Sequence, residues 1–217
     1  MLERFIQALS TDLPGDEDPA ATRLRLKARF PAGAVRRMTQ LGLLVGATLG
    51  ELLTEQDDTL VYASQFGEGR ALESFLDSFP TPSPTLFQTS IQPSGVQQGL
   101  IGRQQAIREL FPLCGSHSLV AEALLTAFTA PAPRVLFCGG DERGTYLIPH
   151  GAASDRTFAF ACALTHTRSA QSLARLSLVP GCAPGELTLH AWAELLHQRR
   201  PFDGPISADW RLQLEWL

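Results

Sequence analysis

Strand and helix patterns alternate along the 217-residue sequence, which predicts an α/β fold with a mixed sheet and helices on both of its faces. Three short apolar runs, over residues 58–64, 106–113 and 134–138, have the length and composition of buried strands. Helical patterns separate these runs, as is typical of parallel strands. Two further strands follow with little between them. The predicted order is therefore β-α-β-α-β-β-β in a single domain.

The segment before this alternation is predicted to be a short helix and a loop. Residues 1–9 carry four apolar side chains on one side of a helix, namely Leu2, Phe5, Ile6 and Leu9. Residues 11–20 are acidic and rich in Pro and Gly, which indicates a loop. We expect an N-terminal helix and acidic loop over residues 1–29 and the domain itself over residues 30–217.

Helical patterns occupy much of that domain. Over residues 34–53, apolar side chains recur at helical spacing at Val35, Met38, Leu41, Leu44 and Val45. Further helices are expected over residues 70–79, 86–105 (broken by Pro93 and Gly95), 117–128 and 186–198.

The last two predicted strands cover residues 157–166 and 172–179. Both alternate polar and apolar side chains, and only a short turn joins them. We expect them to form an antiparallel addition at one edge of the sheet.

Composition and charge suit one globular core and exclude some classes of partner. With 44% hydrophobic and 18% charged residues, the chain can bury one sizeable core. Its formal net charge is -4 and its pI is about 5.7. Nucleic acids and anionic membranes attract proteins through a cationic field, so we expect neither as a partner.

Six basic residues nonetheless gather within a short stretch, namely Arg23, Arg25, Lys27, Arg29, Arg36 and Arg37. One interpretation is a solvated helical face followed by a loop. The other is a docking surface for an acidic partner, and we assign Arg36 and Arg37 to that role.

Neither a membrane span nor a cofactor site is expected. No stretch approaches the ~20 apolar residues of a span, and the N-terminus lacks a signal-peptide pattern, so the expected compartment is the cytoplasm. Cys162 and His166 lie on a predicted strand about 13 Å apart. Zinc ligands must lie ~2.0–2.3 Å from one ion. The four cysteines, three of them in apolar settings, are expected to be free and buried (Cys114, Cys138, Cys162 and Cys182).

Several motifs taken together resemble a known family. The chain contains FPAGAVRRMTQLGLL, then VYASQFGE, then SPTLFQTSI, and it ends near DWRLQLEW. Between them lies a helix, a turn, an Ala-rich helix and a strand ending in Gly139-Gly140. In this order they resemble the short β-ketoacyl synthase-like N-terminal domain proteins, from about Phe30 to the end of the chain.

This resemblance implies a thiolase-like fold equal to about half of a β-ketoacyl synthase. It also implies a chain-length-factor-like role in aryl-polyene, polyketide or fatty-acid biosynthesis, with a ketosynthase or an acyl carrier protein as partner. It places the substrate pocket at Gly115, Ser116, Phe87, Gly139 and Gly140. A complete condensing enzyme also needs two histidines, which the family carries in its second half.

The position of the family nucleophile remains open between two residues. Spacing back from Gly139-Gly140 places it at Cys114, whereas alignment of the following helix places it at Gly115. A reactive cysteine needs a helix N-terminus, where the dipole and free N–H groups favour the thiolate. Where relatives show Ser-Val-His-Asn, this chain has Gln92-Pro93 at the last two positions, which disfavours retained ketosynthase chemistry.

Other polar residues near this turn have ordinary interpretations. Ser116 is expected to cap the helix, and His117 to lie in its first turn, although paired with Cys114 it suggests a hydrolase. Asp141 and Glu142 are expected in a solvated turn.

Three functions follow from these observations. The chain is an accessory subunit that pairs with a ketosynthase or with itself, an acyl-transferring or thioester-hydrolysing enzyme that uses Cys114, or a binding module unrelated to acyl chemistry. An isolated half should also expose an apolar edge strand, over residues 106–113, so we expect a homo- or hetero-oligomer.

Overall fold

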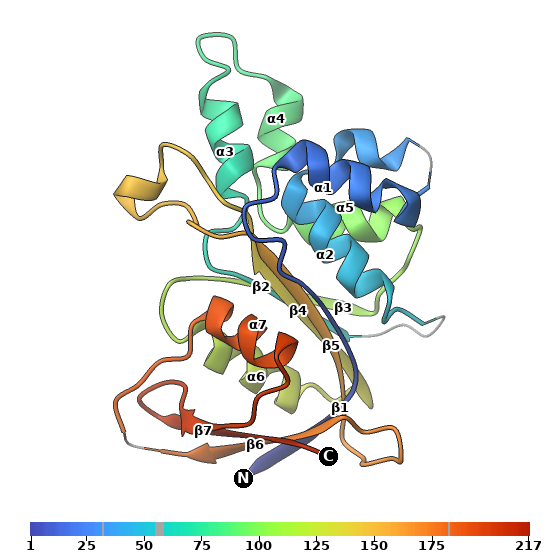
Figure 1. Ribbon diagram of the computed structural model, residues 1–217, viewed down its shortest axis with the longest axis vertical. Coiled ribbons are helices and arrows are strands. Elements are labelled where there is room, and N and C mark those ends of the chain that lie inside the picture. The colour runs from blue at the N-terminus through green and yellow to red at the C-terminus, as the bar shows by residue number, and fades with distance from the viewer. Residues whose placement is uncertain (32, 55–58, 182) are drawn as a thin grey trace.

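A mixed β-sheet runs through the computed structural model, which describes residues 1–31, 33–54, 59–181 and 183–217 (Figure 1). Its strands are β1 (Leu2–Asp12), β2 (Thr59–Ser64), β3 (Glu109–Cys114), β4 (Arg134–Asp141), β5 (Phe158–Thr165), β6 (Ala174–Pro180), β7 (Phe202–Pro205) and β8 (Trp210–Trp216). Over the described residues the strand order is β3-β2-β4-β5-β1-β6-β8-β7. Strands β2, β3 and β4 are mutually parallel, whereas the other neighbouring pairs are antiparallel. The predicted mixed sheet is confirmed.

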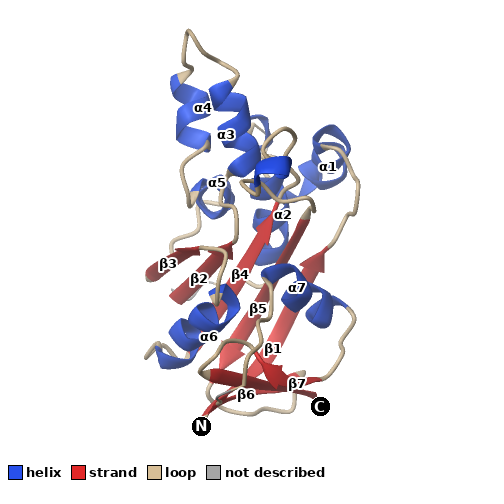
Figure 2. Cartoon of the chain, turned by 90° about the vertical axis from the view of Figure 1, so that its left-hand side faces the viewer, coloured by secondary structure: helices blue, strands red, loops and turns tan. Residues whose placement is uncertain are grey.

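Helices cover both faces of the sheet, as predicted (Figure 2). They are α1 (Pro19–Leu26), α2 (Gln40–Gly50), α3 (Gly69–Leu76), α4 (Pro84–Thr89), α5 (Ser94–Gly102), α6 (Leu119–Thr129) and α7 (Leu189–His197), with 3-10 turns η1 (Lys27–Arg29), η2 (Ala34–Arg37) and η3 (Ile148–His150). Helices α6 and α7 enclose one apolar core, which contains Phe137 and Trp192. Helices α2 and α5 enclose the other, which contains Leu60 and Tyr62. Helices α3 and α4 project beyond the sheet (Figure 1).

The register of the parallel strands aligns their carboxyl ends. Every residue of β2 is buried, as expected for a central parallel strand. Ser64 lies opposite Cys114, and Ala63 lies opposite Gly139. The loops that follow the three strands therefore begin at the same edge of the sheet, where α/β proteins commonly place their sites.

The N-terminal segment is a strand, so the helix expected over residues 1–9 is wrong. Strand β1 pairs antiparallel with both β5 and β6, and Phe5 lies between Thr165 and Arg175. Ile6 is fully buried. The apolar spacing of this segment suits a helix, but pairing on two sides satisfies its backbone N–H and C=O groups equally well.

The last part of the sheet also differs from the expectation. Strands β5 and β6 do not pair with each other at an edge, because β1 lies between them. No strand is predicted for the tail that forms β7 and β8. Strand β7 is short and contains Gly204 and Pro205, whereas the alternation of β8 is typical of a strand.

The helix expected over residues 34–53 begins later. Thr39 has an extended backbone, and its Oγ1 accepts the N–H of Gly42 at 2.9 Å. This cap starts α2 at Gln40. Arg36 and Arg37 therefore lie in the separate turn η2.

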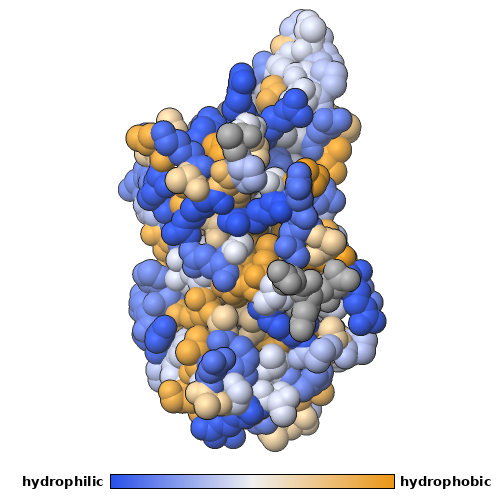
Figure 3. Space-filling view, turned by 90° about the vertical axis from the view of Figure 1, so that its right-hand side faces the viewer, coloured by the Kyte–Doolittle hydropathy of each residue, from blue (hydrophilic) through white to orange (hydrophobic). Residues whose placement is uncertain are grey.

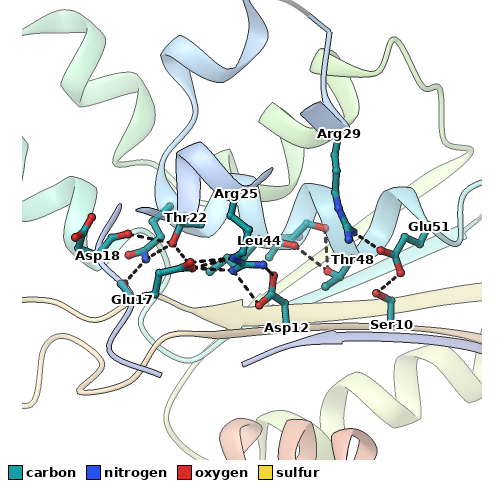
Figure 4. A network of polar contacts seen from close by, with 12 residues as sticks. Ser10, Asp12, Glu17, Asp18, Thr22, Arg25, Arg29, Leu44, Thr48 and Glu51 are labelled. Carbon is teal, nitrogen blue, oxygen red and sulfur yellow. Dashed lines mark hydrogen bonds and ion pairs between the residues drawn. The ribbon is translucent and has the colours of Figure 1, made fainter. Parts of the chain in front are cut away.

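Two of the six clustered basic residues form ion pairs within the chain (Figure 4). Arg25 lies 2.7 Å from both Asp12 and Glu17, and Arg29 pairs with Glu51. Exposed pairs of this kind contribute at most about 1 kcal/mol each. Arg25 and Arg29 therefore already have acidic partners within the chain.

The surface combines polar and apolar areas. On the face in Figure 3, hydrophobic side chains gather in the middle, with hydrophilic ones above and below. Five exposed large hydrophobic residues lie on or beside the projecting hairpin α3–α4, namely Leu72, Leu76, Phe79, Phe87 and Ile91. None of the helices in the described residues is long and apolar enough to cross a bilayer.

A buried arginine ties β1 to the connection between α6 and β4. Arg4 is fully buried, and its guanidinium donates to the carbonyl oxygens of Phe128, Ala130 and Ala132 at 3.2, 2.8 and 3.4 Å. No ion pair neutralises this side chain among the described residues. The three carbonyl groups therefore supply its polar surroundings in place of water.

We expect Arg4→Met to lower the free energy of unfolding by about 2–4 kcal/mol, because three buried carbonyl groups lose their donor. Urea unfolding at neutral pH measures this change. The control is Arg175→Met on β6, whose exposed pairs with Glu3 and Glu215 should cost less than about 0.5 kcal/mol. Equal losses in the two variants would contradict the role of Arg4.

Candidate functional site

The candidate site lies at the carboxyl ends of the parallel strands β2, β3 and β4. Strand β2 ends at Ser64, β3 at Cys114 and β4 at Asp141. A Cβ added to Gly67, just after β2, would lie 3.7 Å from Cys114 Sγ and 3.8 Å from Gln92 Oε1. The loops after these strands and the segment before α5 therefore meet at this edge.

Cys114 is exposed at the end of β3 rather than at a helix N-terminus. Its Sγ lies 3.6 Å from the carbonyl oxygen of Gln65. Neighbouring atoms still remove part of the water around its sulfur, and this partial desolvation raises the pKa of Cys114. The charges of Asp141 and Glu68 raise it further. These surroundings favour the neutral thiol over the nucleophilic thiolate.

Helix α6 starts later than expected, which corrects two predictions. Its N-cap is Ser118, in the left-handed region at φ 55°, and the N–H of Ser118 donates to Glu186 Oε1 at 2.9 Å. Ser116 is therefore not the cap. His117 precedes the helix with its side chain 87% exposed, and its Nδ1 lies 3.7 Å from Glu186. Its ion-pair partner is this carboxylate.

The glycines of the expected pocket have different surroundings. A Cβ at Gly115 would meet nothing within 4 Å, so open space adjoins the alternative nucleophile position. A Cβ at Gly139 or Gly140 would lie 2.1 Å from Ala63 O or 2.2 Å from Phe158 O. Close approach of the neighbouring strands therefore requires glycine at both positions.

Phe87, the remaining residue expected in the pocket, lies on the projecting helix α4. Its ring centroid is 5.3 Å from that of Phe75, and the side chain is half exposed. The structure therefore brings Cys114 and Gly115 together with the end of β4, and it places Phe87 on the hairpin.

Asp141 and Glu142 are buried, so the solvated turn expected for them is wrong. Strand β4 continues to Asp141, and the side chains of Asp141 and Glu142 both lie inside the protein. Asp141 Oδ1 accepts a hydrogen bond from the hydroxyl of Ser64 at 2.7 Å and another from the N–H of Phe66 at 3.1 Å. These donors from the end of β2 replace water around the carboxyl group.

Two carboxyl groups lie at helix N-termini. Glu142 Oε2 accepts the N–H of Leu41 in the first turn of α2 at 2.9 Å. Glu68 Oε1 accepts the N–H of Gly95 in the first turn of α5 at 2.7 Å. We call Glu68, Asp141 and Glu142 the carboxyl cluster.

Burial raises the pKa of each member of this cluster. The pKa of Glu68 is about 8, and those of Asp141 and Glu142 are about 7. A helix N-terminus favours a negative charge by roughly 0.3–1 kcal/mol. Leaving a buried carboxylate unpaired costs several kcal/mol. The second effect is larger, and it favours the protonated carboxyl groups.

Glu73 provides a contrast within the same region. It is buried on α3, and its carboxylate accepts the N–H groups of Thr145 and Leu147 and the hydroxyl of Thr145. Burial acts to raise its pKa, but these hydrogen bonds and the charge of Arg70 leave the pKa of Glu73 lowered. The pKa of Glu73 is therefore lowered by several donors together with the nearby positive charge of Arg70.

A groove of about 1180 Å³ lies beside the cluster, between the segment 33–38 and the helices α4 and α5. Arg36 and Arg37 are the charged residues in its described lining, which includes no acidic side chain. Five glutamines also line it, namely Gln88, Gln92, Gln97, Gln98 and Gln104. Neither arginine forms an ion pair with the residues described. The groove therefore suits an anionic or hydrogen-bonding ligand.

The described residues contain no group of three or more His, Cys, Asp or Glu side chains that could hold a metal ion. Cys114, Cys138 and Cys162 are free thiols, as predicted, and Cys138 and Cys162 are buried, whereas the burial expected for Cys114 is wrong. The prediction for Cys182 lies outside the described residues.

Comparisons with known proteins identify the fold. No family model and no curated protein matches the sequence. The structure is similar to a chain in the complex of a ketosynthase (ApeO) with its chain length factor (ApeC) from Xenorhabdus doucetiae. The match has a TM-score of 0.69 and 19% identity, and it covers 98% of this chain and 100% of the other.

Two solved structures match less well. The tetronic acid condensing enzyme AbyA1 has a TM-score of 0.42 and 13% identity, with 85% of this chain and 64% of the other covered. Germicidin synthase from Streptomyces coelicolor, a type III polyketide synthase, has a TM-score of 0.40 and 11% identity, with 100% and 70% covered. The thiolase-like fold expected from the sequence is confirmed by the ApeO–ApeC match.

We expect iodoacetamide to alkylate Cys114 more slowly than a cysteine in a short unstructured peptide at about pH 7.5, because less thiolate is present. Asp141→Asn should increase the rate, since it removes a negative charge that raises the pKa of the thiol. Mass mapping of peptides separates Cys114 from the other cysteines. Alkylation faster than in the peptide would contradict this assignment.

Proposed function

We propose that this chain is a cytoplasmic accessory subunit of the β-ketoacyl synthase kind, without condensing activity of its own. It would serve polyketide or fatty-acid biosynthesis of the aryl-polyene type, together with a ketosynthase and an acyl carrier protein. The observation that carries this proposal is the setting of Cys114. The thiol lies at a strand end beside buried carboxyl groups, so thiolate formation and oxyanion binding at a helix N-terminus lack support.

The correspondence in fold supports this role. The match to a chain of the ketosynthase and chain length factor complex extends over the whole of that chain. The sequence motifs point to the same kind of protein. An accessory subunit needs the fold and a pairing surface, but it does not need an activated nucleophile.

The pairing surface that we propose is the edge of β3. This strand ends the sheet, as predicted, and Phe111 on it is 39% exposed. An unpaired edge presents N–H and C=O groups to another chain. A partner strand or loop would cover both the edge and Cys114.

The docking site that we propose for an acyl carrier protein is the groove beside Arg36 and Arg37. The chain carries a net charge of -4, yet the only charged side chains in the described lining of this groove are these two arginines. A local cationic wall of this kind attracts an acidic partner and guides its orientation.

One observation favours an alternative, in which the chain is an enzyme. Cys114 is the exposed thiol among the described cysteines, and it lies at the edge that a partner would cover. A partner could then complete an acyl-transferring or thioester-hydrolysing site around it. That function requires rapid alkylation of Cys114, lost in Cys114→Ser, and the raised pKa of the thiol opposes it.

We expect the tagged chain, purified from its own cells, to retain a full-length ketosynthase in near-stoichiometric amount. Phe111→Asp should weaken this association by at least tenfold, because it places a charge at the apolar edge of β3. The matched control is Leu24→Asp on α1, which is exposed and distant from that edge in sequence. Purification of the chain alone, or equal retention by both variants, would overturn the pairing surface.

We expect the double variant Arg36→Glu/Arg37→Glu to weaken binding of a carrier protein by about tenfold, or ~1.4 kcal/mol, since two attractive charges become repulsive. Arg199→Glu/Arg200→Glu changes the net charge equally at the end of α7 and should have little effect. Titration by isothermal calorimetry at low and at high salt measures both. Equal losses would indicate a net-charge effect and would remove the docking site from the groove.

A further inference from the structure

The two walls of the groove adjoin helix N-termini that donate hydrogen bonds to the carboxyl cluster. One wall, the segment 33–38, continues into α2, where the N–H of Leu41 donates to Glu142. The other wall includes α5, where the N–H of Gly95 donates to Glu68. Each wall is therefore connected through a backbone hydrogen bond to a carboxyl group of the same cluster.

Three oxygen atoms in or beside the carboxyl cluster are buried without a hydrogen-bond partner among the described residues. They are Glu68 Oε2, Glu142 Oε1 and the hydroxyl of Tyr62. The Tyr62 hydroxyl and Glu68 Oε1 both lie 3.2 Å from the point that a Cβ on Gly95 would occupy, so the hydroxyl points into the cluster. A charged carboxylate with a buried, unpartnered oxygen is strongly disfavoured, and a bound proton removes the charge.

The other groups that face the cluster supply little positive charge. The positive charge of Arg70 on α3 favours the ionised form of Glu142. Arg70 is partly exposed, however, and lies 3.9 Å from the carboxylate of Glu73, whose negative charge opposes ionisation of Glu142. From β3 and β4, the cysteines Cys114 and Cys138 contribute no positive charge. None of the described ion pairs includes Glu68, Asp141 or Glu142.

The protonation equilibria fall in the physiological range. Burial raises the pKa of Glu68 to about 8 and those of Asp141 and Glu142 to about 7. In the unfolded chain these groups ionise near pH 4, so they bind more protons in the folded state. The stability that they contribute is therefore fully present below about pH 4 and is lost progressively as the pH rises to about 8.

We propose that Glu68 and Glu142, the two members of the cluster that bind helix N-termini, form a proton-linked latch that sets the width of the groove. With their protons bound, the carboxyl groups hold the N-termini of α2 and α5 close together. Release of these protons to solvent leaves buried negative charges that repel one another and move the two walls apart. The latch follows from the cluster alone, whereas its effect on carrier-protein docking rests on the proposed function.

Hydrogen exchange followed by mass spectrometry tests the latch without any partner. After correction for intrinsic rates, peptides covering residues 38–50 and 94–102 should exchange about tenfold faster near pH 8.5 than near pH 6. The double variant Glu68→Gln/Glu142→Gln keeps an acceptor oxygen at each position but cannot ionise. In this variant we expect the pH dependence of both peptides to disappear.

The control is Glu73→Gln, which removes a buried carboxylate from the same region but outside the cluster. It should retain the pH dependence of both peptides, with at most a small shift of the midpoint, because the charge of Glu73 contributes to the raised pKa of Glu142. Exchange that is equal at the two pH values in the wild type, or that remains pH-dependent in the double variant, would overturn the latch.

Infrared spectroscopy of the wild-type protein answers the same question if the double variant fails to fold. Ordinary carboxyl groups are ionised near pH 6, so a protonated carboxyl band at that pH must come from groups with a raised pKa. We expect such a band near pH 6 and its loss near pH 9. No band near pH 6 would refute the proposal, whatever the outcome of the docking measurements.

Discussion

The pairing of β1 with β5 on one side and with β6 on the other is the contact on which the whole sheet depends. It joins the parallel strands β2, β3 and β4, through β5, to the ribbon formed by β6, β8 and β7. Arg4 extends the same contact out of the sheet plane, because its guanidinium holds the connection between α6 and β4. Both apolar cores include residues on strands beside β1. The first strand of the chain is thus the element that unites the later ones.

The candidate site follows from a second constraint, namely what happens to polar groups at the covered ends of parallel strands. Strand β4 ends at Asp141, which accepts hydrogen bonds from Ser64 and Phe66 at the end of β2. The next residue, Glu142, lies beneath the first turn of α2. Glu68 lies beneath the first turn of α5 in the same way. The segment that leads into α2 and the helix α5 both line the groove, so the buried acids and the groove adjoin the same two helix N-termini.

The sequence predicts the parts of this fold that depend on local patterns. The three parallel strands, the helices on both faces and the exposed position of β3 could all be inferred from apolar runs and helical spacing. The role of β1 could not, because Leu2, Phe5, Ile6 and Leu9 fit a helix and a strand equally well. Only pairing with residues more than 150 positions away decides between the two.

The sequence predicts a position for the site but not its detail. The turn after β3 and the Gly139-Gly140 pair predict a site at the end of the parallel strands, the edge at which the carboxyl cluster lies. The start of α6 depends on the left-handed backbone of Ser118 and on Glu186 from a distant loop, and neither leaves a local signal. An acidic pair after a strand is commonly solvated, and only the helices packed above it reveal that Asp141 and Glu142 are buried.

The edge strand β3 contains a proline, and this affects how the chain behaves before assembly. Pro112 follows Phe111 and is exposed in a strand of six residues. Proline removes a hydrogen-bond donor, and a short edge strand offers little length for repeated addition of further strands. Repeated strand addition by identical chains is therefore disfavoured, while a single partner can still bind the remaining free backbone groups of the edge and contact Phe111. Before assembly, the same residue that limits pairing thus lowers the tendency of the free chain to aggregate through this strand.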